Sequence, residues 1–152
     1  MNQILTMRAM YNRNLKKWLR FQLKEWHDNS LRKANYTCFI TGKKSGGKNH
    51  FQLDVHHLDI TFDMILHEAL DALGLAFHKL TTNYTPEELE QIVQEVTRRH
   101  QDTPYLVLSR DAHENIHRLY GSNPTMEQIR EYKRSYNTRR RNALNGNQKK
   151  RK

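Results

Sequence analysis

The stretch YLVLSRDAHENIHRLYG, residues 105–121, combines a short strand with a helix that contains two histidines. Its first four residues are apolar or aromatic and favour a strand, and Ser109 can then cap a helix that ends at Gly121. His113 and His117 are four residues apart in this helix, so both imidazoles project from one face and can reach a single metal ion. The spacing alone is weak evidence, because nine histidines in 152 residues produce such pairs by chance.

A second predicted strand, earlier in the chain, ends in another pair of histidines. In residues 51–57, FQLDVHH, apolar and polar side chains alternate, which predicts a half-buried strand that leads to His56 and His57. Asp54 lies two residues before His56, hence on the same face of the strand, where its carboxylate can accept a hydrogen bond from that imidazole. The alternative is that Asp54 is only an exposed strand residue. Two strands that each lead to a histidine pair favour one shared metal site.

A helical hairpin is predicted between the two strands. Apolar residues recur with helical period from Phe62 to Leu73 and stop at Gly74, a residue that commonly ends helices. The next helix begins in residues 85–88, TPEE, where the threonine caps the helix, the proline takes its first position and the second glutamate completes a capping box. The predicted order is therefore strand, two-helix insert, strand and helix.

Further elements are predicted on either side of this core. Residues 12–34 show an apolar stripe opposite lysines and arginines, which predicts one amphipathic helix that docks on a core. Residues 36–40, YTCFI, predict a short β-rich stretch. A last helix starts at Thr125 with capping-box spacing, and beyond Asn137 we expect disorder.

The chain has a formal net charge of +10, and its positive charge is concentrated at the two ends. Residues 12–34 are basic, residues 59–95 are acidic, and no acid follows Glu131. This distribution fits a protein whose ends contact phosphates of a polyanion. The alternative is a solvated basic tail without a dedicated partner.

No membrane partner is expected from the sequence. No run reaches the roughly 18 apolar residues of a membrane span, and the first residues lack the features of a signal peptide. The single cysteine, Cys38, forms no internal disulfide and agrees with a reducing compartment. We therefore expect an intracellular protein, in the cytoplasm of a bacterium or of a phage-infected host.

Residues 53–58, LDVHHL, and 106–117, LVLSRDAHENIH, resemble the two halves of the HNH nuclease motif, whose ββα-metal core holds a histidine pair on a β element and another ligand on the closing helix. The resemblance covers roughly residues 36–132. Over these residues the chain is similar to phage-type HNH homing endonucleases that carry a helical insert. It implies an α+β fold, a ββα-metal core with a two-helix insertion flanked by basic helices. The expected divisions are a basic amphipathic N-terminal helix in residues 1–35, the nuclease core in 36–123 with its insert in 59–103, and a basic C-terminal helix and disordered tail in 124–152.

The resemblance also implies hydrolysis of DNA phosphodiester bonds with one divalent metal ion. His57 takes the place of the general base, His56 and His113 take the places of metal ligands, and His117 that of an additional histidine found in some members. A neutral imidazole, with an unperturbed pKa of about 6.5, can accept a proton from water near neutral pH. Histidine ligands suit Zn²⁺, Ni²⁺ or Mn²⁺, whereas the family usually works with Mg²⁺, so the identity of the metal stays open.

This sequence departs from the family in two features. The family's middle asparagine would fall near Pro104, and none of residues 102–105 is asparagine, which bears on the geometry of the loop more than on the chemistry. The second departure concerns structural zinc. Many HNH proteins stabilise the core with a zinc ion held by four cysteines, and the corresponding positions here are Cys38, Thr41, Ser109 and Ala112. Only one of the four is a thiol, so we expect no structural zinc and interpret Cys38 as a buried packing residue. The insert helices and one of the two tryptophans then stabilise the core instead.

Two other functions remain as alternatives. One is a catalytically inactive HNH scaffold that binds nucleic acid, but the presence of all four histidines argues against it. The other is the nuclease of a toxin or restriction system. The sequence does not determine the recognition sequence, whether one or both strands are cut, or the oligomeric state. The basic residues expected to contact DNA are Lys16, Lys17, Arg20, Lys43, Lys44, Arg110, Arg118, Arg139, Arg140 and Arg141.

Overall fold

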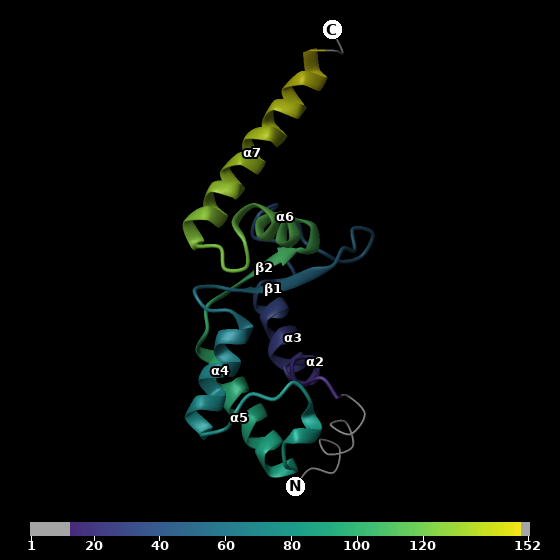
Figure 1. Ribbon diagram of the computed structural model, residues 1–152. Coiled ribbons are helices and arrows are strands. Elements are labelled where there is room, and N and C mark those ends of the chain that lie inside the picture. The colour runs from purple at the N-terminus through teal and green to yellow at the C-terminus, as the bar shows by residue number, and fades with distance from the viewer. Residues whose placement is uncertain (1–12, 150–152) are drawn as a thin grey trace. The chain divides into compact units, whose positions relative to one another are not determined.

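The computed structural model describes residues 13–149, with side chains as far as residue 146. These residues form two compact units. The helical unit combines residues 13–29 with residues 60–103, and the sheet unit combines residues 30–59 with residues 104–149. The described part of the chain has an α+β fold, with helices α2 to α7 and one two-stranded sheet (Figure 1).

The helical unit contains α2 (Leu15–Gln22), the first part of α3 (Lys24–Lys33), α4 (Phe62–Leu73), a 3₁₀ turn (Thr81–Asn83) and α5 (Pro86–Asp102). The predicted hairpin is confirmed, because α4 ends at Gly74 in the left-handed conformation and α5 begins with the predicted capping box. Apolar faces of α2, α4 and α5 pack together into one core. Its buried residues are Leu15, Trp18, Leu19, Leu23, Phe62, Ile65, Leu66, Ala69, Leu70, Tyr84, Leu89, Ile92 and Val96.

The prediction of one continuous helix over residues 12–34 is wrong. The helix is interrupted at Leu23, whose ψ of 7° lies outside the α-helical region, and the chain continues as α3. Leu23 remains buried beside Leu19, so the apolar stripe still faces the core as predicted. The break therefore changes the course of the backbone but not the set of residues that α2 buries.

The sheet unit is built on β1 (Leu53–His57) and β2 (Tyr105–Ser109), which pair antiparallel with His56 opposite Leu106. Helix α6 (Arg110–Tyr120) follows β2 directly and contacts both strands (Figure 1). Helix α7 (Met126–Lys149) then leads away from the sheet. The core of this unit consists of Cys38, Ile40, Leu53, Leu58, Val107, Leu108, Ala112, Ile116, Ile129 and Tyr132.

Two predictions in this unit are wrong. Residues 36–40 form only an isolated bridge between Thr37 and Lys44, because positive φ angles at Asn35 and Tyr36 and a turn closed by Gly42 leave no room for an extended strand. The chain beyond Asn137 is helical to residue 149 rather than disordered. The arginines in this segment favour helix, and its one glycine lies near the end, at residue 146.

Candidate metal centre

The junction between β2 and α6 determines where the two helical histidines lie. Ser109 ends the strand, and its side chain accepts a hydrogen bond from the Ala112 backbone at 3.4 Å, so α6 begins with no intervening loop. The helix therefore starts at the end of β2 and packs against both strands. It contains His113 and His117. On β1, Asp54 and His56 occupy alternate positions and share one strand face.

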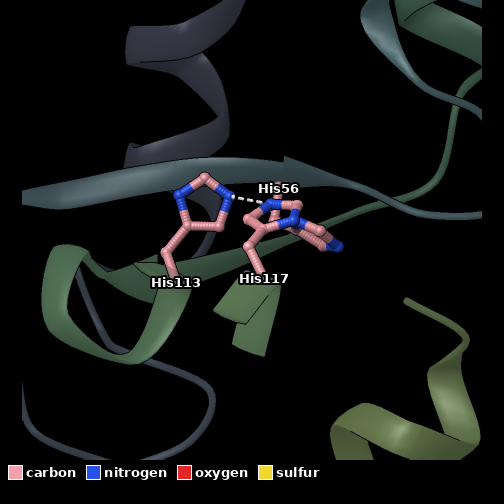
Figure 2. A group of neighbouring side chains, drawn as sticks. All are labelled: His56, His113 and His117. Atoms are coloured by element: carbon pink, nitrogen blue, oxygen red, sulfur yellow. Dashed lines mark hydrogen bonds between the residues drawn. The ribbon is translucent and has the colours of Figure 1, made fainter. Parts of the chain in front are cut away.

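Three imidazoles meet at this place, those of His56, His113 and His117. Each ring offers a nitrogen, and the three nitrogens lie within 4.8 Å of one another. The ring centroid of His56 is 5.1 Å from that of His113 and 5.1 Å from that of His117. Figure 2 shows the rings grouped between the strand and the helix. The structure thus brings together all three residues that the sequence suggested as metal ligands.

Hydrogen bonds determine which nitrogen of each helical histidine bears the proton. The Nδ1 atom of His113 lies 3.1 Å from the Asp54 carboxylate, and the Nδ1 atom of His117 lies 2.8 Å from the carbonyl oxygen of Gly121. Both partners accept hydrogen bonds, so each Nδ1 bears a proton. The two Nε2 atoms face each other at 3.0 Å, which is a hydrogen-bond distance. Such a contact needs a proton between the two nitrogens, and a metal cation can take the place of that proton.

His56 adds a third nitrogen in a buried environment. Only 4% of its surface is exposed, and its Nε2 atom has no hydrogen-bond partner among the described residues. The pKa of His56 is lowered to about 4, first by burial and then by the repulsion that protonated His113, His117 and His57 would exert on a second positive charge. The ring is therefore neutral near pH 7 and able to donate a lone pair.

These residues fit a bound transition-metal ion. Metal-ligating histidines usually donate the other ring N–H to a carboxylate or a carbonyl oxygen, as His113 and His117 do here. Two nitrogens bound to a tetrahedral zinc ion at bond lengths near 2.0 to 2.1 Å are about 3.3 Å apart, so the observed 3.0 Å requires little movement. Three imidazoles also leave coordination positions for water or substrate, which is typical of catalytic rather than structural sites.

Asp54 links this group to a nearby cation. Its hydrogen bond from His113 lowers the pKa of its carboxyl group, burial opposes this, and the guanidinium of Arg110 at 3.3 Å lowers it further. Asp54 is therefore ionised near neutral pH. The sequence predicted that Asp54 orients an imidazole, and the structure shows this contact with His113 rather than with His56.

His57 is not one of the three grouped histidines. It follows His56 at the last position of β1, opposite Tyr105, and is half-buried. Because successive strand side chains alternate between faces, β1 presents His57 on the face opposite Asp54 and His56. The positive charge of His57 still contributes to the lowered pKa of His56, so the two imidazoles interact electrostatically.

The four positions that correspond to zinc-binding cysteines lie close together. The thiol of Cys38 donates to the Ser109 hydroxyl at 3.6 Å and accepts from the Ser109 backbone N–H at 3.2 Å. Burial raises the pKa of this thiol, but hydrogen bonds from Thr41 and Ser109 outweigh that effect and lower it overall. Cys38 is fully buried, as predicted. A hydroxyl–thiol cluster thus occupies this position beside Ala112.

The basic residues expected to contact DNA are divided between the units. Lys16, Lys17 and Arg20 belong to the helical unit, and the other seven belong to the sheet unit. Lys16 forms an ion pair with Asp63 at 2.9 Å, and Arg20 stacks over Phe62. Arg110 lies beside the histidine group through Asp54. The remaining side chains, Lys43, Lys44, Arg118, Arg139, Arg140 and Arg141, are exposed.

One contact in the site was not predicted from the sequence. The carbonyl oxygen of Gly121 accepts the Nδ1 hydrogen bond of His117. The signal that could have indicated it is spacing, because a helix that ends four residues after a histidine leaves unpaired carbonyl groups within reach of that side chain.

Comparisons with protein-family models, with curated proteins and with solved structures found no match to this chain. Among the described helices, none combines the length and apolar character needed to span a membrane.

Proposed function

We propose that this chain is a metal-dependent endonuclease of the HNH type that hydrolyses phosphodiester bonds in DNA. The observation that supports it most strongly is the meeting of His56, His113 and His117, in which the Nε2 atoms of the two helical rings face each other at 3.0 Å. These residues come from a strand and from the helix that closes a β-β-α arrangement, in the chain order of the HNH motif. A net charge of +10 supports a polyanionic substrate.

In this proposal the three histidines hold the ion, and Asp54 and the Gly121 carbonyl orient the two helical rings. These three residues would hold a divalent ion, which would offset negative charge on the scissile phosphate and assist departure of the 3′ oxygen. We assign to Arg110, which pairs with Asp54, a contact with a phosphate next to the site. The three imidazoles favour Zn²⁺, Ni²⁺ or Mn²⁺ over Mg²⁺, which prefers oxygen ligands.

We assign His57 as the general base that accepts a proton from the attacking water. It is next to a ligand in the chain but outside the ligand group, so its imidazole is not needed to hold the ion. The strand alternation places it on the other face of β1, so the attacking water must reach it at the end of the strand, where His57 is the last paired residue.

The test uses purified full-length protein and supercoiled plasmid, with Mg²⁺, Mn²⁺, Zn²⁺ or Ni²⁺ added singly and with EDTA. We expect nicked or linear product only when an ion is present. His117→Ala should lose both metal binding and cleavage, while His67→Ala, which changes an exposed histidine of α4, should keep both. Cleavage in EDTA would contradict the proposal. If the protein binds DNA but cleaves it with none of the four ions, the inactive scaffold is favoured.

A further inference from the structure

Helix α7 is anchored to the sheet unit by one side only. Ile129 is fully buried, Tyr132 is 8% exposed, and Tyr136 packs partly against the same core. Lys133 lies on this side as well, with its ammonium group 4.0 Å from the centroid of the Phe39 ring. These contacts hold the first three turns, and every described side chain from residue 137 to residue 146 is exposed.

Another face of α7, roughly 120° around the helix axis from Ile129, presents a row of arginines and asparagines. Successive members are separated by four, three, four and four residues, which places them on one helix face about 22 Å long at 1.5 Å per residue. All of them are exposed. This α7 stripe consists of Arg130, Arg134, Asn137, Arg141 and Asn145.

None of the three arginines of the α7 stripe forms an ion pair with a described residue. Glu127 and Glu131 precede Arg130 and Arg134 by three residues on the same helix, and no acid follows Glu131, so the second half of the stripe carries positive charge alone. Like charges one turn apart on a helix repel each other, so this face is stabilised by a polyanion. Arginine and asparagine are also the side chains that form paired hydrogen bonds with guanine and adenine edges in the major groove.

We propose that the α7 stripe enters the major groove of duplex DNA and contacts base edges there. The inference rests on the proposed function, because it names the part of the chain that selects the DNA sequence. A helix with side chains is about 10 to 12 Å wide, and the major groove of B-DNA is about 12 Å wide. Duplex RNA is excluded as the partner of this face, since its major groove is too deep and narrow for side chains to reach the bases.

The charge of the stripe alone would produce phosphate contacts without sequence preference, so the test must separate base contacts from charge. Arg134→Lys keeps the charge but removes the planar fork that pairs with guanine. Asn137→Ala removes an amide in the middle of the stripe. Arg139→Lys is the matched control, because Arg139 lies on the side of α7 away from the stripe, where a phosphate contact accepts either cation.

Full-length parent and variants are each used to select bound sequences from a pool of randomised DNA duplexes in EDTA, so that no strand is cut. The parent should select a defined sequence. Arg134→Lys and Asn137→Ala should each lose preference at one or two base pairs, by roughly 5- to 150-fold per pair, and Arg139→Lys should select the parent sequence. A parent without sequence preference, or preferences unchanged in both stripe variants, would overturn the inference. Metal-dependent plasmid cleavage would then still stand as support for the nuclease function, because the two measurements are independent.

Discussion

The Nε2 atoms of His113 and His117 lie 3.0 Å apart, while the Nδ1 atom of each ring contacts an acceptor. The two facing Nε2 atoms need a proton between them, or a metal ion in its place. The buried imidazole of His56 adds a third nitrogen, which favours the ion. The arrangement therefore favours a metal ion through local hydrogen bonding as well as through residue type.

Asp54→Asn should weaken metal binding by about 10- to 100-fold without unfolding the protein. The asparagine oxygen can still accept the Nδ1 hydrogen bond of His113, but the negative charge that makes this ligand a better donor is lost. Isothermal titration with Zn²⁺ measures the change. Asp63→Asn is the matched control, because Asp63 pairs with Lys16 in the helical unit. Equal zinc affinity in parent and Asp54→Asn would show that Asp54 does not support the ligand.

The metal-free protein should lose stability as the pH falls from 7 towards 5, and His100 should contribute to this loss. Burial lowers the pKa of His100, and a hydrogen bond with the Val96 carbonyl only partly opposes it. Its folded-state pKa thus lies below the unfolded value of about 6.5, so between the two values the unfolded chain binds more protons. The stabilisation is complete above pH 6.5 and is lost as the pH falls through the folded pKa.

Thermal melts of His100→Leu in EDTA between pH 5 and pH 7 test this account. The variant removes a side chain that packs against Trp26 and Phe62, so its Tm should be lower at pH 7, but its Tm should depend less on pH than that of the parent. His67→Leu, on the exposed side of α4, should keep the parent dependence. A pH dependence of Tm that is the same in His100→Leu and parent would rule out the contribution of His100.

Replacement of three residues by cysteine should create a second metal site in the sheet unit. Thr41→Cys, Ser109→Cys and Ala112→Cys, combined in one chain, place thiols around Cys38, which already contacts Ser109. Four thiolates bind zinc tetrahedrally. Loss of the Ser109 cap costs about 1 kcal/mol, which the bound ion offsets.

The expected result is one more bound zinc ion per chain than in the parent, with the absorption spectrum of tetrahedral cobalt thiolate after exchange for Co²⁺. The same triple variant with Cys38→Ser should lose that spectrum. If the triple variant with Cys38 intact binds no additional ion, the four positions are not arranged as in a zinc-braced HNH core.

Trp18→Ala should destabilise the helical unit by about 3 to 5 kcal/mol, because the indole is 1% exposed within the core formed with α4 and α5. Trp18→Phe should cost less, since the indole Nε1 has no hydrogen-bond partner among the described residues. Phe21→Ala changes a residue of the same helix that is 49% exposed and should cost about 1 kcal/mol or less. Urea unfolding measures all three, and equal costs for Trp18→Ala and Phe21→Ala would mean that α2 does not dock as described.

Local signals in the sequence were sufficient for most of the helices and strands. The capping box at Thr85 and the glycine stop at Gly74 depend only on neighbouring residues, and both are present in the structure. The break at Leu23 has no such signal, because leucine is a good helix former and the apolar stripe continues through it. The helix beyond Asn137 was missed because high charge and low hydrophobicity predict disorder, although arginine itself favours helix.

The candidate site was predictable in its members but not in its internal contacts. His113 and His117 could be paired by helical spacing, and the position of His56 at the end of a strand suggested the third ligand. The contact between Asp54 and His113 depends on the packing of α6 against β1. Residue spacing within α6 or within β1 does not determine that packing. The same applies to Arg110, whose pairing with Asp54 joins residues 56 positions apart.

The most direct test of the central claim is the rate of plasmid cleavage by His57→Ala at saturating metal, relative to the parent. We expect the variant to cleave at less than a tenth of the parent rate while binding one ion per chain with parent affinity, because His57 acts on water and not on the ion. Cleavage above a tenth of the parent rate, or loss of metal binding in this variant, would contradict the assignment of His57 as base and of His56, His113 and His117 as ligands.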